Sequence, residues 1–205
     1  MLQKNPKIRA LESVIKLPSL SKLLDIGCST GDLTVYISNK LSIVQMFGVD
    51  IDDEALSKAK GIITYLLDIS REKPPFTENS FEVCTMLDVI EHLENPDHVI
   101  KEVYRVLKRG GYLILSTPNL ASWYDRMLLL LEKPILGIDL SVECRYRYPF
   151  GVTQVISGHR RLYTLDSLKY LLSFHSFKLL KAKGYPQVLS KTLAKGFIRF
   201  RSCFR

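Results

Sequence analysis

KLLDIGCSTGDLT, residues 22–34, is the stretch that decides the fold. It opens with an apolar run that is typical of a buried strand, and Asp25 places a carboxylate near the end of that run. Small residues from Gly27 to Gly31 then form a turn, and a helical pattern follows. Such a turn exposes backbone N–H groups at a helix N-terminus, and no bulky side chain blocks a ligand. The stretch therefore predicts a binding turn of the nucleotide type.

Apolar strand-like runs alternate with helical patterns along most of the chain. The strands that follow the opening one are expected near residues 43–51, 62–69, 81–89, 112–117 and 177–183, and helices near 6–17, 33–41, 53–60, 96–110 and 165–174. This alternation predicts an α/β fold, a Rossmann-like doubly wound and mostly parallel sheet with helices on both faces. The tail, residues 191–205, fits either a basic amphipathic helix or a final antiparallel strand interrupted by Gly196.

Local signals mark where several of these elements begin and end. Asn95 and Thr164 are suitable N-cap residues, and the run from Lys108 to Gly110 is typical of a helix end. The leucines of the last helix, Leu165 included, are expected to face inward. Gly184 and the residues after it are expected to end the last strand before the tail.

The composition indicates a globular protein with one core. Its 205 residues are 46% hydrophobic and 24% charged, which fits a single domain over residues 1–205. The four cysteines are scattered, so the sequence predicts neither a disulfide framework nor a metal site, and it favours a reduced, cytoplasmic setting. The N-terminus has no signal-peptide pattern, and oligomeric state has no signal in the sequence.

The positive charge is concentrated in the last quarter of the chain. Residues 158–205 contain 11 Lys or Arg and one acid, whereas residues 1–157 contain 18 Lys or Arg and 20 acids. An aromatic and leucine-rich insertion at about 120–157 precedes this basic region and resembles a lid. Together they favour a small-molecule or amphiphilic acceptor and peripheral membrane contact through the insertion and the basic C-terminus. The basic residues alternate with core leucines, which does not favour nucleic acid.

Acidic residues recur at the ends of the first four predicted strands, as Asp25, Asp50, Asp68 and Asp88. Ligands bind beyond the carboxyl ends of parallel strands, so these acids predict one shared site. Asp50 lies nineteen residues after Gly31, where a carboxylate can bind ribose hydroxyls. The glycine spacing of dinucleotide-binding dehydrogenases is absent, so a nicotinamide oxidoreductase is the less favoured alternative.

Five blocks of the sequence, taken together, resemble class I S-adenosylmethionine-dependent methyltransferases. They are DIGCSTG, FGVDI, LLDISREKPPFTENSFEVC, LDVIEHLENPDHVIKEVYRVLKRGGYLILSTPN and GHRRLYTLDSLKYLLSFHSFKLL, and they cover roughly residues 23–185. The last block is similar to the ubiquinone-biosynthesis and glycan-cluster branches of the family. The chain departs from the usual first motif at Ser29, which stands in place of the middle glycine.

The resemblance implies S-adenosylmethionine as the cofactor and assigns residues to it. Asp25 would help hold the ammonium group over the turn, Asp50 the ribose and Asp68 the adenine amino group. The other implied cofactor-binding residues are Gly27, Cys28, Ser29, Gly31, Ile51, Ile69, Leu87 and Asp88.

The expected reaction is methyl transfer, directed to oxygen, on a small-molecule, glycan, glycolipid or quinone-like acceptor. A hydroxyl acceptor must lose a proton, and His92 and His159 are the candidate bases. For both histidines a structural role is the competing interpretation. A protein of this fold that binds the cofactor or a partner without catalysis is a second alternative, and Ser29 is its only support.

Overall fold

The structure is a computed structural model, and it describes residues 22–148, 153–154, 156–187 and 193–202. The helix expected near residues 6–17 lies outside the described residues. No helix within the described part of the chain has the length and apolar character needed to cross a membrane.

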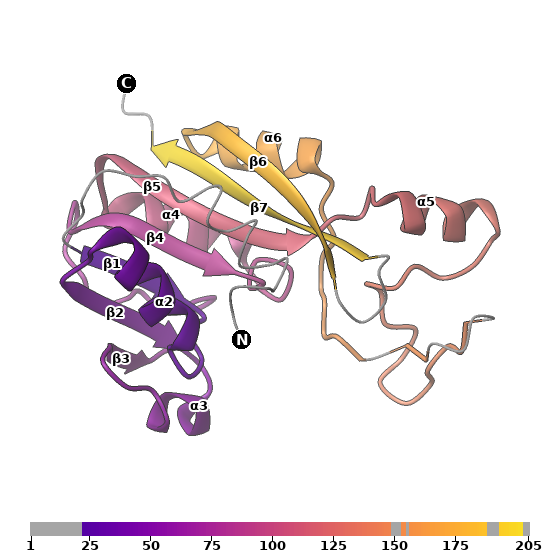
Figure 1. The fold of residues 1–205 in the computed structure, drawn as a ribbon, viewed down its shortest axis with the longest axis horizontal. Helices are drawn as coiled ribbons and strands as arrows, with labels where there is room; N and C mark the ends of the chain where they lie inside the picture. The colour runs from indigo at the N-terminus through magenta and orange to yellow at the C-terminus, as the bar shows by residue number, and fades with distance from the viewer. Residues whose placement is uncertain (1–21, 149–152, 155, 188–192, 203–205) are drawn as a thin grey trace.

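A seven-stranded sheet forms the centre of the described chain (Figure 1). Its strands are β1 (Lys22–Ile26), β2 (Gln45–Asp50), β3 (Ile63–Leu66), β4 (Phe81–Leu87), β5 (Leu107–Pro118), β6 (Phe177–Gln187) and β7 (Leu193–Ser202). The order is β3-β2-β1-β4-β5-β7-β6. The first five strands are parallel, and β7 is antiparallel to both β5 and β6. The mostly parallel Rossmann-like fold is confirmed, and the tail is a strand.

Five helices accompany the sheet in the described residues: α2 (Asp32–Leu41), α3 (Asp53–Ser57), α4 (Pro96–Val106), α5 (Trp123–Leu130) and α6 (Leu165–Phe174). Two of their starts follow the predicted caps. The side chain of Asn95 accepts a hydrogen bond from the His98 N–H at 3.1 Å. Thr164 and Ser167 form a capping box at the start of α6. Local sequence therefore sets both helix starts.

Two expected boundaries and one expected side-chain orientation are wrong. Lys108 to Gly110 do not close α4; they form the first part of β5, where Leu107 pairs with Phe81 and is fully buried. The strand β6 continues through Gly184 to Gln187 because β7 pairs with it over that length. The side chain of Leu165 is 45% exposed, because it occupies the first position of α6 and does not reach the core.

Two apolar clusters hold the layers together, and each combines strand and helix side chains. In the larger cluster, Leu24, Ile26 and Met86 pack with Val99 and Val103 of α4. The smaller one joins Leu23, Val83 and Ile114 to Ile37 of α2. Neighbouring strand residues point to opposite faces, so β1 sends Leu23 to one cluster and Leu24 to the other. The central strands are thereby covered on both faces, and their carboxyl ends are left to build a site.

Candidate functional site

The turn after β1 has the backbone conformation that its small residues predict. Gly27, Ser29 and Gly31 all have positive φ, at 72°, 47° and 78°. The N–H groups of Gly27 and Cys28 donate to the carbonyl oxygen of Val49, at 2.8 and 3.2 Å. A Cβ on Gly27 would lie 2.4 Å from Val89 Cγ2. The turn is therefore fixed against β2 and requires glycine at its start.

Asp25 lies beneath this turn and its side chain does not line the cavity described below. It is buried, and its carboxylate accepts hydrogen bonds from the hydroxyls of Thr34 and Thr85, the latter at 2.6 Å. These bonds join β1 to α2 and β4. The ammonium-binding role of Asp25 stays a prediction, while the observed contacts show a carboxylate that holds three elements together.

Cys28 also points into the protein. Its side chain is buried, and burial, followed by the charges of Asp25 and Asp50, raises the pKa of the thiol to about 12. The thiol is therefore protonated at neutral pH and is not a nucleophile. It fills space within the turn.

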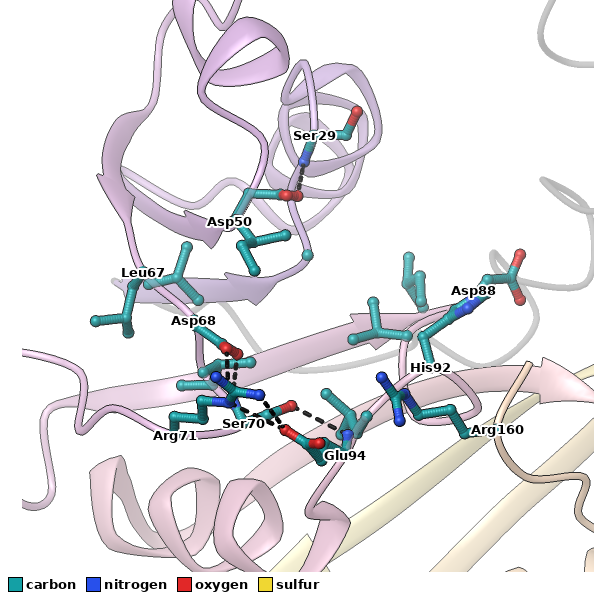
Figure 2. Close-up of a pocket in the computed structure, with 17 residues that line it drawn as sticks. Ser29, Asp50, Leu67, Asp68, Ser70, Arg71, Asp88, His92, Glu94 and Arg160 are labelled. Atoms are coloured by element: carbon teal, nitrogen blue, oxygen red, sulfur yellow. Dashed lines mark hydrogen bonds and ion pairs between the residues drawn. The ribbon is translucent and has the colours of Figure 1, made fainter. Parts of the chain in front are cut away.

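A cavity of about 690 Å³ lies at the carboxyl ends of β1, β2 and β4 (Figure 2). The strand order places β1 between β2 and β4, so this is where the two halves of the parallel sheet diverge. Most of the predicted residues line the cavity: Gly27, Ser29, Asp50, Ile51, Asp68, Ile69, Leu87, Asp88 and His92. The lining does not include four other predicted residues: Asp25, Cys28, Gly31 and His159. The volume of the cavity is within the range of small-molecule sites, about 300–1,000 Å³.

Asp50, at the end of β2, is held in a defined orientation. One carboxylate oxygen accepts from the Ser29 N–H at 2.7 Å, and the other accepts from the Asp52 N–H at 3.0 Å. Figure 2 shows the first of these bonds. Carboxylate oxygens accept more than one hydrogen bond each, so Asp50 can still receive two hydroxyl groups of a ribose.

A charged group that sequence reasoning missed closes one side of the cavity. Arg71 donates to the carboxylate of Glu94 at 3.0 and 2.8 Å, and it lies 3.5 Å from the carboxylate of Asp68 (Figure 2). The Ser70 N–H donates to Asp68 at 3.0 Å. Arg71 and Glu94 are 23 residues apart, so only the fold brings them together.

Asp88 occupies the corresponding place after β4. Its φ is +59°, and its carboxylate accepts from the Ser116 hydroxyl at 2.8 Å. The Asp88 N–H also donates to the Ser116 carbonyl oxygen at 2.9 Å. β5 therefore holds this acid at the cavity in a backbone conformation that few residues other than glycine adopt.

His92 and His159 meet although they are far apart in sequence. Their ring centroids are 4.8 Å apart, and both approach Glu91, whose side chain is fully buried. The carbonyl oxygen of Glu91 accepts from the N–H groups of Arg160 and Arg161, at 2.8 and 3.1 Å. These bonds fix the loop after β4 to the segment before α6. His92 lines the cavity, and His159 does not.

The insertion contacts this region through Asp139. Its carboxylate accepts from the N–H groups of Ser157 and Gly158, at 2.9 and 2.7 Å. Burial acts to raise the pKa of Asp139, and the bonds from Ser157 and Gly158 together outweigh it, so the pKa of this carboxyl is lowered. Nδ1 of His159 lies 2.9 Å from the carbonyl oxygen of Gly137. Residues 137–139 therefore position the segment that carries His159.

The residues of the cavity fit a nucleoside cofactor that carries positive charge. Four acids, Asp50, Asp68, Asp88 and Glu94, line it together with two cations, Arg71 and Arg160. A glycine-containing turn leaves room at its wall. Acids suit ribose hydroxyls as well as ammonium and sulfonium groups. Fold and cavity together define an α/β protein that binds a cationic nucleoside cofactor.

Comparisons with known proteins agree with this class. Residues 24–115 match a family model described as "Methyltransferase domain". The ubiquinone/menaquinone biosynthesis C-methyltransferase UbiE of Rickettsia prowazekii is 24% identical over 212 residues, which cover 95% of this chain and 80% of the relative.

Two solved structures share the fold. A SAM-dependent methyltransferase from Methanosarcina mazei aligns with a TM-score of 0.66 at 19% identity, over 92% of this chain and 95% of that one. The [4+2]-cyclase SpnF aligns with a TM-score of 0.69 at 15% identity, over 99% and 83%. These likenesses show the fold alone.

The chain contains a methyltransferase domain within the class I, Rossmann-like fold, and the family match and its relatives indicate S-adenosylmethionine as the cofactor. The family model covers the turn, the strand-end acids and the loop that carries His92. The nicotinamide alternative is set aside by this match.

Proposed function

We propose that the enzyme methylates a hydroxyl oxygen of an amphiphilic, quinol-like small molecule. The observation that carries the proposal is the pair of imidazoles, His92 and His159, at the edge of the cofactor cavity. Methylation of a hydroxyl forms an O–CH3 bond, breaks an S–CH3 bond and releases the hydroxyl proton. A histidine at this place is suited to take that proton near neutral pH.

S-adenosylmethionine, when bound, supplies an electrophilic methyl group on a sulfonium. The protein's own task is to bind, align and dehydrate the reacting groups. Asp50 and Asp68 would hold the nucleoside, and Leu87 and Asp88 lie beside the expected place of the sulfonium. Proton removal falls to the cluster that contains His92, because this histidine lines the same cavity.

Methyl transfer to carbon is the second candidate, because the relative from Rickettsia prowazekii is named a C-methyltransferase. An assay with [methyl-13C]-labelled cofactor and a short-chain prenylated catechol separates the two reactions. We expect the 13C shift of the product to be that of a methoxy group; an aryl-methyl shift would replace our proposal by the second candidate. Titration with the demethylated cofactor and with NAD provides a control for the binding site.

Replacing either histidine is expected to slow the reaction without preventing cofactor binding. Loss of a general base reduces turnover by about 10²–10⁴-fold, so His92→Ala and His159→Ala should both lose most activity. The matched control is His98→Ala, which removes a histidine that bonds the carbonyl oxygen of Glu72 and does not line the cavity. Unchanged turnover in both variants would assign proton removal to water or to the acceptor.

The surface of α5 supports an acceptor that resides in a membrane. Trp123, Met127 and Leu130 are 63%, 47% and 77% exposed, and they recur along one side of the helix with Leu131 after it. An exposed apolar stripe with a tryptophan suits the interface of a bilayer, and the exposed cation Arg126 suits anionic lipid.

Trp123 reports on this contact directly because the chain contains one tryptophan. We expect a blue shift of its fluorescence with vesicles that contain phosphatidylglycerol, and co-sedimentation of the enzyme with them. Leu130→Asp should abolish both, because it places a charge within the apolar stripe. Leu165→Asp alters an exposed leucine on α6 and should change neither. Equal binding by the two variants would move the membrane contact away from α5.

A further inference from the structure

Glu91, His92 and His159 form a cluster of metal-binding groups beside the cofactor cavity. Each residue offers one ligand atom, and these atoms all lie within 4.8 Å of one another. Two nitrogens and a carboxylate oxygen are a common ligand set for divalent ions of the first transition row. The cysteine positions gave no hint of such a site; the cluster exists only in the folded chain.

The hydrogen bonds of both imidazoles set the tautomer that a metal requires. Nδ1 of His92 lies 3.2 Å from the Gly158 carbonyl oxygen, and Nδ1 of His159 lies 2.9 Å from the Gly137 carbonyl oxygen. A carbonyl oxygen only accepts, so in both rings Nδ1 carries the proton. In a neutral ring, Nε2 then presents a lone pair. Metal-binding histidines in proteins are usually oriented by a bond of this kind.

The third group, Glu91, is a fully buried carboxylate between the two histidines' loops. A cation at this place would interact favourably with the buried carboxylate. The neighbouring side chain of Arg161 donates to the carbonyl oxygens of Leu93 and Glu94, at 2.6 and 3.2 Å, and so helps to fix the same loop.

The dimensions of the cluster are close to those of a metal site. Three atoms bound to one ion at about 2.1 Å lie about 3.0–3.6 Å from one another. The ligand atoms of the cluster lie within 4.8 Å of one another, so the widest pair needs to close by up to about 1–2 Å to enclose an ion. His92 is exposed and His159 partly exposed, which leaves room for further ligands from the solvent side.

We propose that Glu91, His92 and His159 bind one divalent first-row transition ion, such as Mn²⁺ or Co²⁺, whose open positions accept an oxygen of the methyl acceptor. The imidazole ligands favour these ions over Mg²⁺, which prefers oxygen. The coordination of the methyl acceptor to the ion rests on the proposed function, whereas the ion site itself does not. A bound cation lowers the pKa of a coordinated hydroxyl, so with the ion present the histidines would aid proton loss as ligands, and in the ion-free enzyme they would act as the bases described above.

Co²⁺ tests the site without any turnover. Enzyme stripped with EDTA should bind one Co²⁺ per chain with visible absorption bands, and catechol should shift those bands. Loss of a ligand should weaken binding by at least about tenfold in His92→Asn, His159→Asn and Glu91→Gln. His92 is at the surface, so the result for His92→Asn holds even if Glu91→Gln fails to fold.

Two outcomes would overturn the ion site: no stoichiometric Co²⁺ or Mn²⁺ binding, or equal binding by the His92→Asn and His98→Ala variants. Co²⁺ bands that catechol leaves unchanged would overturn the coordination of the acceptor to the ion. Methyl transfer to oxygen at full rate in EDTA would remove the ion from the reaction and leave the proposed function intact. Co²⁺ binding without formation of an O-methylated product would leave the ion site intact and remove the proposed function.

Discussion

Asp50→Ala is expected to weaken S-adenosylmethionine binding by at least about tenfold. The carboxylate is oriented by the N–H groups of Ser29 and Asp52, and it lines the cavity at the end of β2. Removing a charged acceptor of two hydroxyls costs about 1.5–3 kcal/mol, which is tenfold or more in the dissociation constant. Calorimetric titration with the cofactor and with its demethylated product measures the change.

Asp50→Asn is the matched variant for this experiment. It keeps the shape and one oxygen acceptor of the side chain but removes the charge, so its affinity should fall between those of the wild type and Asp50→Ala. A second control, Asp53→Ala, removes an exposed acid from the first turn of α3 that does not line the cavity. Unchanged affinity of Asp50→Ala would exclude Asp50 from the cofactor site.

Gly27→Ala is expected to destabilise the protein by about 2–5 kcal/mol and to remove cofactor binding. The φ of 72° costs about 1–2 kcal/mol for an L-residue, and the added methyl group would lie 2.4 Å from Val89. Overpacking of a site of this kind adds about 1–3 kcal/mol. Urea denaturation measures the first effect and calorimetry the second.

The neighbouring position supplies the control. Ser29 also has a positive φ, 47°, but its side chain is exposed. Ser29→Gly restores the glycine usual in related motifs, so its stability should stay within about 1 kcal/mol of the wild type and its affinity should be equal or higher. If Gly27→Ala behaved as Ser29→Gly does, the turn would not have the rigidity that its contacts indicate.

Features that depend on neighbouring residues could be predicted from the sequence. The Asn95 cap, the Thr164 cap and the acid at each strand end are local signals. Both caps form, and Asp50, Asp68 and Asp88 line the cavity, whereas Asp25 is buried beneath the turn. The segment from Lys108 to Gly110 shows the limit of such signals. It has the composition of a helix end, but pairing of Leu107 with Phe81 places it in β5.

Features that depend on distant pairing could not be predicted. His92 and Gly158 are 66 residues apart, and no local pattern fixes the contact between them, although His92 and His159 are both candidate bases in the sequence. The same holds for Arg160, which lines the cavity from a segment outside the first four strands. The tail became a strand because β5 and β6 both pair with it, and its own pattern allowed a helix as well.

The position of β7 has a consequence for the order in which a nascent chain can fold. In the sheet, β6 has β7 as its only strand neighbour within the described residues, so β6 cannot join before residues 193–202 leave the ribosome. The cavity depends little on that step, because all its lining residues except Arg160 lie between Gly27 and Glu94. The cofactor pocket can therefore form during synthesis, and a ligand bound there would stabilise the parallel half before the antiparallel half exists.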